Sequence, residues 1–346
     1  MNRQNLLTLL ATFALLFCFT YFCNAKGKDK AKHVVFIGLD GWGAYSLPKA
    51  DMPNVKKLME DGSYTLKKRS ALPSSSAINW ASMFMGTGPE LHGYTEWGSK
   101  TPELPSRVLN KNGIFPTVFQ LLRDARPEAE IGCLYEWEGI KYLVDTLSLN
   151  YHYHVADCNK TPKELGNMAS AYIKEKHPAL VAICYDGPDH TGHTEGHDTP
   201  AYYEKLKELD IYVGQIVQAV KDAGILDDTI FILTSDHGGI DKGHGGKTMQ
   251  EMETAFIISG KNIKKGLRFD DVSMMQYDVA STIASIFNLE QPQVWIGRPM
   301  KIVFKYTERL LLKYSHYTKS LLTEKMTLLK KRISKQSGKA LITSTV

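Results

Sequence analysis

Aspartate and histidine gather in two short stretches of this chain. Asp189 and His193 are four residues apart in one stretch, and Asp236, His237 and His244 lie in the other, which is rich in glycine. Carboxylate and imidazole groups are the ligands that a zinc-type ion accepts. A polar turn with surface histidines is the alternative interpretation of the glycine-rich stretch, so the rest of the sequence has to decide between the two.

A third acidic candidate, Asp40, ends an apolar run near the start of the chain. A turn-forming aspartate is the alternative interpretation, because Asp-Gly is a common turn pair. Asp186, His190 and His197 belong to the first stretch and rank lower, because surplus histidines in such loops often support ligands or face solvent. Three aspartates and three histidines therefore remain as the main candidates.

Three consecutive serines, Ser74–Ser76, precede a segment with helical character, Ala77–Met85. A hydroxyl group at a helix N-terminus faces free N–H groups and the positive end of the helix dipole, which favours phosphate. Asn79 lies one turn into this helix from Ser76, and its amide could stabilise charge on a non-bridging phosphate oxygen. N-capping alone is the alternative interpretation, since serine is a favoured cap.

Together these side chains are the parts of a two-metal site for in-line displacement at phosphorus. A metal ion would lower the pKa of Ser76 and make it the nucleophile. The candidate metal ligands are Asp40, Ser76, Asp189, His193, Asp236, His237 and His244. Two zinc ions are expected, with manganese or iron as alternatives because the ligands are rich in oxygen.

Apolar runs and amphipathic segments alternate from residue 32 to residue 304. Strands are expected at residues 32–39, 130–135, 179–184, 228–234 and 253–260, and helices at residues 51–59, 77–85, 115–125, 162–176, 200–223 and 278–287. This alternation predicts an α/β fold with a largely parallel central sheet sandwiched by helices. Side chains that follow such strands meet at the carboxyl edge of the sheet, where open α/β sheets place their sites.

The chain has 346 residues, enough for one large domain or two small ones, and its 43% hydrophobic content is that of a globular protein. Residues 1–25 have the pattern of a cleaved export signal, with a retained membrane anchor as the alternative. Residues 26–305 are expected to form the catalytic domain, and residues 306–346 a basic helical tail. Export predicts a periplasmic or extracellular location.

The net charge of +5 is unevenly distributed. Residues 306–346 hold nine Lys or Arg and two Glu, whereas residues 26–305 are slightly acidic and show no basic patch for nucleic acid. The tail could contact an anionic membrane surface weakly, although a solvated helix packed loosely on the domain is favoured. Among the cysteines, Cys133 and Cys158 could form a bridge, and Cys184 is expected to be a buried thiol.

Four motifs, in this order, resemble those of the alkaline phosphatase superfamily, and most closely its type I phosphodiesterase/nucleotide pyrophosphatase branch. They are Gly38-Leu-Asp40-Gly41, Ser76-Ala-Ile-Asn79 followed by Gly86 and Pro89-Glu-Leu-His92-Gly93, Pro188-Asp189-His-Thr-Gly192-His193, and Ser235-Asp236-His237-Gly238. The resemblance covers residues 32 to about 304 and implies an alkaline-phosphatase-like fold.

The resemblance also implies roles for individual residues. One zinc ion is expected on Asp189, His193 and His244, and the other on Asp40, Ser76, Asp236 and His237. Counting back from Pro89 and His92 places Ser76 at the position of the nucleophile. Two features depart from that branch, which usually has threonine at the nucleophile and, in its animal members, a much longer spacing before the residue that matches His244.

The resemblance implies an exported two-zinc phosphodiesterase or nucleotide pyrophosphatase that acts on a small phosphate ester or nucleotide through a covalent phospho-Ser76. One alternative is a phosphomonoesterase or phosphonate hydrolase on the same site. A monoester has a further charged oxygen that needs a cation, for which Lys100 and Lys141 are candidates. The other alternative is a non-catalytic binding protein on this fold. The chain lacks the Cys/Ser-x-Pro-x-Arg signature of sulfatases, and the large extra domains of animal phosphodiesterases are not expected within its 346 residues. Its natural substrate and oligomeric state stay open.

Overall fold

The computed structural model of the chain describes residues 30–156, 162–305, 323 and 327. It divides into two compact units, Met1–Met300 and Lys301–Val346. The fold and the site described below belong to the first unit. The expected export signal lies outside the described residues, as does almost all of the expected basic tail. Within the described ranges, no helix has the length and apolar character needed to cross a membrane.

One sheet of eight strands runs through the first unit, in the order β4-β3-β5-β1-β6-β7-β2-β8. The strands are β1 (His33–Leu39), β2 (Gly62–Arg69), β3 (Ile131–Tyr135), β4 (Tyr151–His154), β5 (Leu180–Tyr185), β6 (Thr229–Thr234), β7 (Glu253–Gly260) and β8 (Leu267–Arg268). Neighbouring strands are parallel from β4 to β6, and only β7 runs against its neighbours. The expected largely parallel sheet is confirmed.

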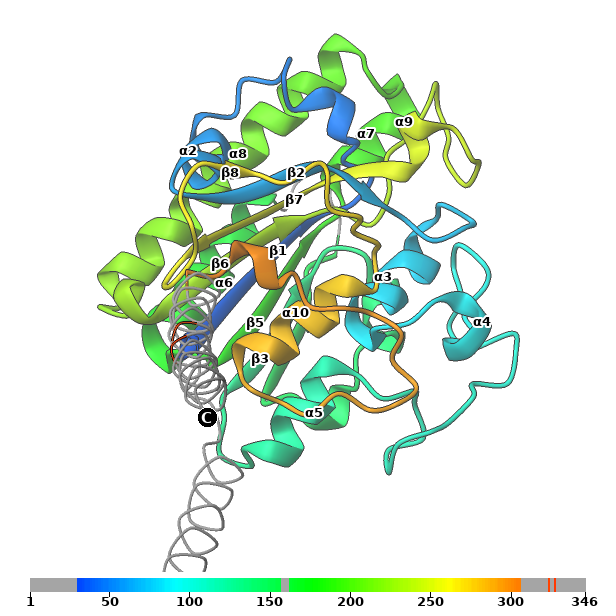
Figure 1. The fold of residues 1–346 in the computed structure, drawn as a ribbon. Coiled ribbons are helices and arrows are strands. Elements are labelled where there is room, and N and C mark those ends of the chain that lie inside the picture. The colour runs from blue at the N-terminus through cyan, green and yellow to red at the C-terminus, as the bar shows by residue number, and fades with distance from the viewer. Residues whose placement is uncertain (1–29, 157–161, 306–322, 324–326, 328–346) are drawn as a thin grey trace, which may run out of the picture. The chain divides into compact units, whose positions relative to one another are not determined.

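Two layers of helices cover the sheet. On one face α8 (Pro200–Asp222) packs against α2 (Pro53–Glu60) and α6 (Pro162–Lys176), and on the other α10 (Asp278–Ile286) packs against α3 (Ser76–Met85) and α5 (Val118–Ala125) (Figure 1). Side chains of β1 alternate between these layers. Val35 and Ile37 belong to the core with α2, α6 and α8, whereas Phe36 lies 6.3 Å from the ring of Trp80 on α3. The two buried faces explain why the central strands are apolar throughout.

The middle of the sheet fixes the position of the candidate ligands. Strand β1 lies between β5 and β6, and Gly38 pairs with both Cys184 and Thr234. The three strands are parallel, so their carboxyl ends meet at one edge of the sheet. Asp40 follows β1, and the two stretches rich in aspartate and histidine follow β5 and β6. The sheet therefore gathers all three stretches in one place.

Three strands of the sheet, β2, β4 and β8, were not predicted from the sequence. Strand β2 ends in Lys67, Lys68 and Arg69, and β4 is the polar segment Tyr151–His154, so neither has an apolar pattern. Strand β8 has two residues. The expected helices and apolar strands are present, with ends that differ by a few residues.

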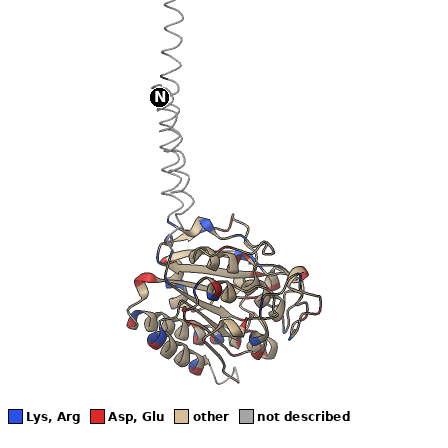
Figure 2. Cartoon of the chain, turned by 90° about the horizontal axis from the view of Figure 1, so that it is seen from below, with Lys and Arg blue, Asp and Glu red and all other residues tan. Residues whose placement is uncertain are grey.

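Charged residues of both signs are spread over the described part of the chain (Figure 2), and two of its cysteines are buried. Figure 2 shows acidic and basic residues interspersed along the described helices. Cys133 and Cys184 are buried free thiols, as expected for Cys184. Cys158, which the sequence offered as a partner for Cys133, lies outside the described residues.

Candidate metal centre

Asp40 is the first ligand candidate at the carboxyl edge of the sheet. Its backbone N–H donates to Tyr185 O on β5 at 2.8 Å, and its Oδ2 accepts a hydrogen bond of 2.8 Å from the Trp80 indole. Its other oxygen, Oδ1, is buried and has no hydrogen-bond partner among the described residues. Oδ1 lies 3.4 Å from Nε2 of His237, so one carboxylate oxygen is anchored and the other is aimed at the neighbouring ligand candidate.

Asp236 and His237 follow β6 and are fully buried. Oδ1 of Asp236 accepts from the N–H of Gly41 at 3.1 Å, while Oδ2 lies 3.2 Å from His237 Nε2 and has no hydrogen-bond partner in the described chain. The Nδ1 atom of His237 lies 2.8 Å from Gly238 O, which fixes the hydrogen on Nδ1 and leaves a lone pair on Nε2. Asp40 and Asp236 therefore each turn one oxygen toward His237 Nε2, which also lies within hydrogen-bond distance of Ser76 Oγ.

Electrostatics of this buried group favour a bound cation. Burial and the charge of Asp189 raise the pKa of Asp236 to about 8, and burial with the charge of Asp236 raises the pKa of Asp40. Burial lowers the pKa of His237 to about 3. Burial thus disfavours the ionised carboxylates and the protonated imidazole. A bound cation would stabilise the ionised carboxylates and could bind the neutral imidazole.

A second group forms around α7 (Gly187–Glu195). Helical spacing places Asp189 and His193 on one face, with 3.1 Å between Asp189 Oδ2 and His193 Nε2. His244 approaches from the loop after β6 and places its Nε2 3.1 Å from that of His193. The hydrogen bond to Asp189 raises the pKa of His193 to about 9, so Asp189 stabilises positive charge on its neighbour.

A tight loop brings His244 back to the site only seven residues after His237. Ile240 and Gly243 form a bridge that closes the turn. The next segment is held by Glu251, which accepts from Gly246 N at 2.7 Å and forms a capping box with Thr248 at the start of α9 (Met249–Met252). The rings of His237 and His244 are stacked with centroids 3.9 Å apart. The short spacing is therefore compatible with ligation.

Ser76 begins α3, and its Oγ lies 3.1 Å from Nε2 of His237. The helix N-terminus gives this hydroxyl a positive electrostatic environment. Ser74 instead donates to Gly246 O at 2.6 Å, and Ser75 occupies the N-cap position. Ser76 is therefore the serine that meets the ligand cluster.

Asn79 is hydrogen-bonded to the loop that precedes Ser76. Its Nδ2 lies within hydrogen-bonding distance of Ala71 O, Pro73 O and Ser75 O at 3.0–3.2 Å, and its Oδ1 accepts from Ala71 N at 2.6 Å. The side chain is fully buried. Its amide group therefore clamps the loop that precedes Ser76, where the sequence suggested a contact with phosphate.

The donor atoms fit a site for two divalent cations. In two groups of three residues, the ligand atoms all lie within 4.8 Å of one another: Asp189, His193 and His244 in one, and Asp40, Asp189 and His237 in the other. Nδ1 of His193 lies 2.9 Å from Lys242 O and Nδ1 of His244 lies 3.1 Å from Ser74 O, so each ring can offer its Nε2 lone pair to a metal ion once it is neutral. The two Nε2 atoms lie 3.1 Å apart, close enough for both to contact one ion.

All seven candidate ligands thus lie in one cluster, with Asp189 shared by the two groups. Of the lower-ranked candidates, Asp186 donates its backbone N–H to Glu136 at 2.8 Å, and His197 is buried beside Asp189. His190 lies on α7, one residue after Asp189.

Several supporting residues were not found from the sequence. Trp80 anchors Asp40, and Lys68 with Gln276 supports the loop after β6. Nζ of Lys68 donates to Ser235 O at 2.7 Å, and Nε2 of Gln276 donates to the carbonyls of Ser235 and Asp236, each at 3.0 Å. Of these residues, only Trp80 had a signal in the sequence, because it lies about one helical turn after Ser76.

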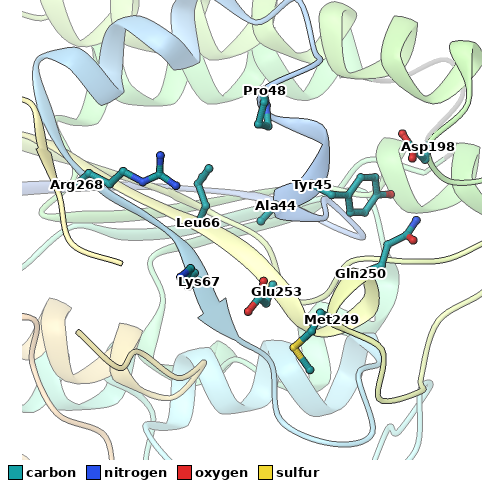
Figure 3. Close-up of a pocket in the computed structure, with 10 residues that line it drawn as sticks. All are labelled: Ala44, Tyr45, Pro48, Leu66, Lys67, Asp198, Met249, Gln250, Glu253 and Arg268. Carbon is teal, nitrogen blue, oxygen red and sulfur yellow. The ribbon is translucent and has the colours of Figure 1, made fainter. Parts of the chain in front are cut away.

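A pocket of about 370 Å³ lies beside this cluster, and none of the seven ligand candidates lines it. Figure 3 shows Tyr45, Asp198 and Gln250 at one end of the pocket and Arg268 at the other. Tyr45 stacks on Tyr202, whose hydroxyl donates to Gly41 O at 2.8 Å. Tyr45 therefore links one wall of the pocket, through Tyr202, to the loop that follows β1.

Comparisons with known proteins agree with this geometry. The family model described as type I phosphodiesterase / nucleotide pyrophosphatase matches residues 34–274. The Bis(5'-adenosyl)-triphosphatase enpp4 of Mus musculus is 26% identical over 221 residues, which cover 61% of this chain and 48% of the relative. The chain thus spans about half the length of that curated relative.

Solved structures show the same fold. Murine ectonucleotide pyrophosphatase / phosphodiesterase 5, as an inactive form in complex with AMP, matches with a TM-score of 0.60 and 14% identity, covering 75% of this chain and 96% of that chain. A 2-O GAG sulfatase matches with a TM-score of 0.63 and 14% identity, covering 78% of this chain and 73% of that chain. At 14% identity, both similarities show only that the sheet and its helices are arranged in the same way.

Proposed function

Because this chain belongs to the type I phosphodiesterase / nucleotide pyrophosphatase family, within the alkaline phosphatase superfamily, we propose that it is a metal-dependent hydrolase of phosphodiester or pyrophosphate bonds. The observation that carries the proposal is the position of Ser76 Oγ, 3.1 Å from His237 Nε2 at the start of α3. A nucleophile beside a cluster of aspartates and histidines is the arrangement that phosphoryl transfer through a covalent intermediate requires.

Two zinc ions are proposed, each held by a group of neighbouring side chains. Asp189, His193 and His244 would hold one ion, and Asp40, Asp236 and His237 would hold the other together with Ser76. When bound, these ions would supply Lewis-acid charge to the oxygens at phosphorus. The mixture of carboxylate and imidazole donors suits zinc and also accepts manganese or iron.

In the proposed reaction Ser76 Oγ attacks phosphorus in line with the leaving group. The Oγ–phosphorus bond forms as the bond from phosphorus to the leaving oxygen breaks, and the leaving oxygen takes the electron pair and the proton that Ser76 releases. Water then attacks the phosphorus of phospho-Ser76: its oxygen stays on the released phosphate, the Oγ–phosphorus bond breaks, and one of its protons restores the serine hydroxyl. The start of α3 places positive backbone charge beside the phosphoryl group, while Asn79 holds the preceding loop in position.

The proposed substrate is a small nucleotide or other phosphate diester. The mouse relative is named a bis(5'-adenosyl)-triphosphatase, and the murine structural neighbour was solved with AMP, which supports this class. We propose an exported enzyme at a periplasmic or extracellular location, with residues 26–305 as its catalytic domain.

A phosphomonoesterase is the second candidate, and the positions of two lysines bear on it. Lys141 pairs with Glu138 at 2.5 Å and lies over the ring of Tyr142, and Lys100 lies 5.8 Å from the centre of the same ring. Neither of these contacts brings a lysine to the ligand cluster, so the diester remains the first candidate.

The test compares two p-nitrophenyl esters, a thymidine monophosphate diester and the simple phosphate monoester, with zinc present. Preference for the diester, lost by more than about 1,000-fold in Ser76→Ala, is the expected result. Ser75→Ala is the matched control, since it removes a neighbouring hydroxyl that does not meet the ligand cluster, and it should retain most activity. Monoester preference would move the assignment to a phosphatase. Full activity in Ser76→Ala would exclude Ser76 as the nucleophile.

A further inference from the structure

His197 is a buried histidine that the proposed mechanism does not use. Its side chain is 0% exposed, and neither ring nitrogen has a hydrogen-bond partner within the described part of the chain. Leaving buried polar atoms without partners destabilises the folded state, so an apolar residue would be favoured here if packing were the only requirement. The presence of a histidine at residue 197 must therefore be explained by the groups that its ring faces.

The ring faces the metal-ligand cluster. Nε2 of His197 lies 3.9 Å from Asp189 Oδ1, an oxygen that is also buried and without a hydrogen-bond partner among the residues described. The other oxygen of Asp189, Oδ2, lies 3.1 Å from His193 Nε2. Asp189 Oδ1 thus lies between His244, whose Nε2 is 3.8 Å away, and His197 at 3.9 Å.

Two glycines hold the His197 ring in this place. A Cβ atom on Gly192 or on Gly239 would lie 2.2 Å from Nε2 of His197, so only glycine leaves room for the ring at either position. The backbone N–H of His197 donates to Asp241 O at 2.6 Å and ties the residue to the loop between His237 and His244. The ring is therefore enclosed by both segments that supply the metal ligands.

We propose that His197 is a positioning residue that donates its Nε2 hydrogen to Asp189 Oδ1 and orients that carboxylate to bind a metal ion with His193 and His244. The two atoms have to approach by about 1 Å to reach hydrogen-bond length. Carboxylates that bind metals are commonly held by such a donor, and its loss typically weakens metal binding or activity by about 10–100-fold. The inference rests on the metal site of the proposed function.

The test measures metal affinity and apoprotein stability separately, on the full chain. His197→Leu should weaken zinc and cobalt binding in chelator competition by about 10–100-fold. The free energy of unfolding of the metal-free protein should stay the same or rise, because an apolar group replaces an unpartnered polar one. A role in packing alone would lower stability and leave affinity unchanged. His152→Leu, which removes an exposed histidine of β4, is the control and should change neither quantity.

Two polar variants keep the test decisive if His197→Leu fails to fold. His197→Gln retains an N–H near the position of Nε2 and should restore most of the affinity, whereas the shorter His197→Asn should not. The inference would be overturned if His197→Leu bound metal as tightly as the unaltered chain. It would also be overturned if the absorption spectrum of cobalt-loaded His197→Gln showed the loss of a nitrogen ligand, because His197 would then bind the metal itself. An unaltered chain that binds no divalent cation would overturn the proposed metal site and this inference with it.

Discussion

His193 and His244 place their Nε2 atoms 3.1 Å apart, although one lies on α7 and the other in the loop after β6. Each ring donates from Nδ1 to a backbone carbonyl, Lys242 O for His193 and Ser74 O for His244. The backbone thus fixes both rings with their lone pairs converging. His244 is therefore a ligand candidate on the same footing as His193, despite its short distance in sequence from His237.

Replacing His244 with alanine should remove one bound metal ion. The expected result is a fall from two to one zinc per chain by elemental analysis, with affinity at the lost site reduced by more than about 100-fold, since even outer partners of a metal contribute up to that amount. His152→Ala is the matched control, because it removes an exposed histidine away from the cluster. Two zinc ions retained in His244→Ala would show that another residue completes the site.

Replacing Trp80 with phenylalanine tests the anchor of Asp40. The change removes the indole N–H that donates to Asp40 Oδ2 at 2.8 Å but keeps an aromatic ring beside Phe36. Metal affinity and kcat/KM should fall by about 10–100-fold. Trp42→Phe is the matched control: its indole nitrogen is buried without a hydrogen-bond partner in the described chain, so no donor to a ligand is lost. Equal metal affinities in the two variants would contradict the anchoring role.

The ligand cluster could be predicted because its residues follow strands that the sequence marks clearly. Apolar runs identify β1, β5 and β6, and parallel pairing then brings Asp40, Asp189 and Asp236 to one edge. Strand β2 was missed because Lys67, Lys68 and Arg69 disguise it, although Lys68 is buried. A buried lysine is recognisable only when its partners are known, and these lie 167 and 208 residues away in sequence.

The direction of the Asn79 side chain could not be predicted either. Helical spacing places it one turn from Ser76, but the spacing does not reveal that the loop from Ala71 to Ser75 folds back over the amide. Whether a polar residue near a nucleophile contacts the substrate or the supporting loop depends on where the backbone carbonyls lie. The positions of those carbonyls are set by the tertiary fold and cannot be derived from the sequence spacing.

Asn79→Ala should therefore act mainly on stability. It deprives Ala71 N and three loop carbonyls of a partner, and the free energy of unfolding in urea should fall by about 2–4 kcal/mol. Ser82→Ala, on the same helix, loses hydroxyl contacts to Ile78 and His92 and should cost about 1 kcal/mol. An Asn79→Ala protein of unchanged stability with impaired turnover would restore the substrate-contact role.

The pH dependence of stability should reveal Lys68. Burial lowers the pKa of its ammonium group to about 7, whereas lysine in an unfolded chain titrates near a pKa of about 10.4. Between these pH values the unfolded chain binds more protons than the folded chain, so stability must rise as the pH rises through this window. The rise attributable to Lys68 is up to about 4 kcal/mol, measured by urea unfolding of metal-free protein from pH 7 to pH 10.

Lys68→Met should remove this slope, because methionine does not titrate, while Gln276 continues to donate to Ser235 O and Asp236 O. The difference between the two proteins should be largest near pH 7, where the buried lysine is most costly to fold, and should shrink toward pH 10. Lys67→Met is the matched control, since Lys67 is the exposed neighbour on the same strand and should leave the slope unchanged. Parallel pH profiles for Lys68→Met and the unaltered chain would mean that Lys68 remains charged in the folded protein, held by Ser235 O and Gln276 as a buried cation behind Asp236.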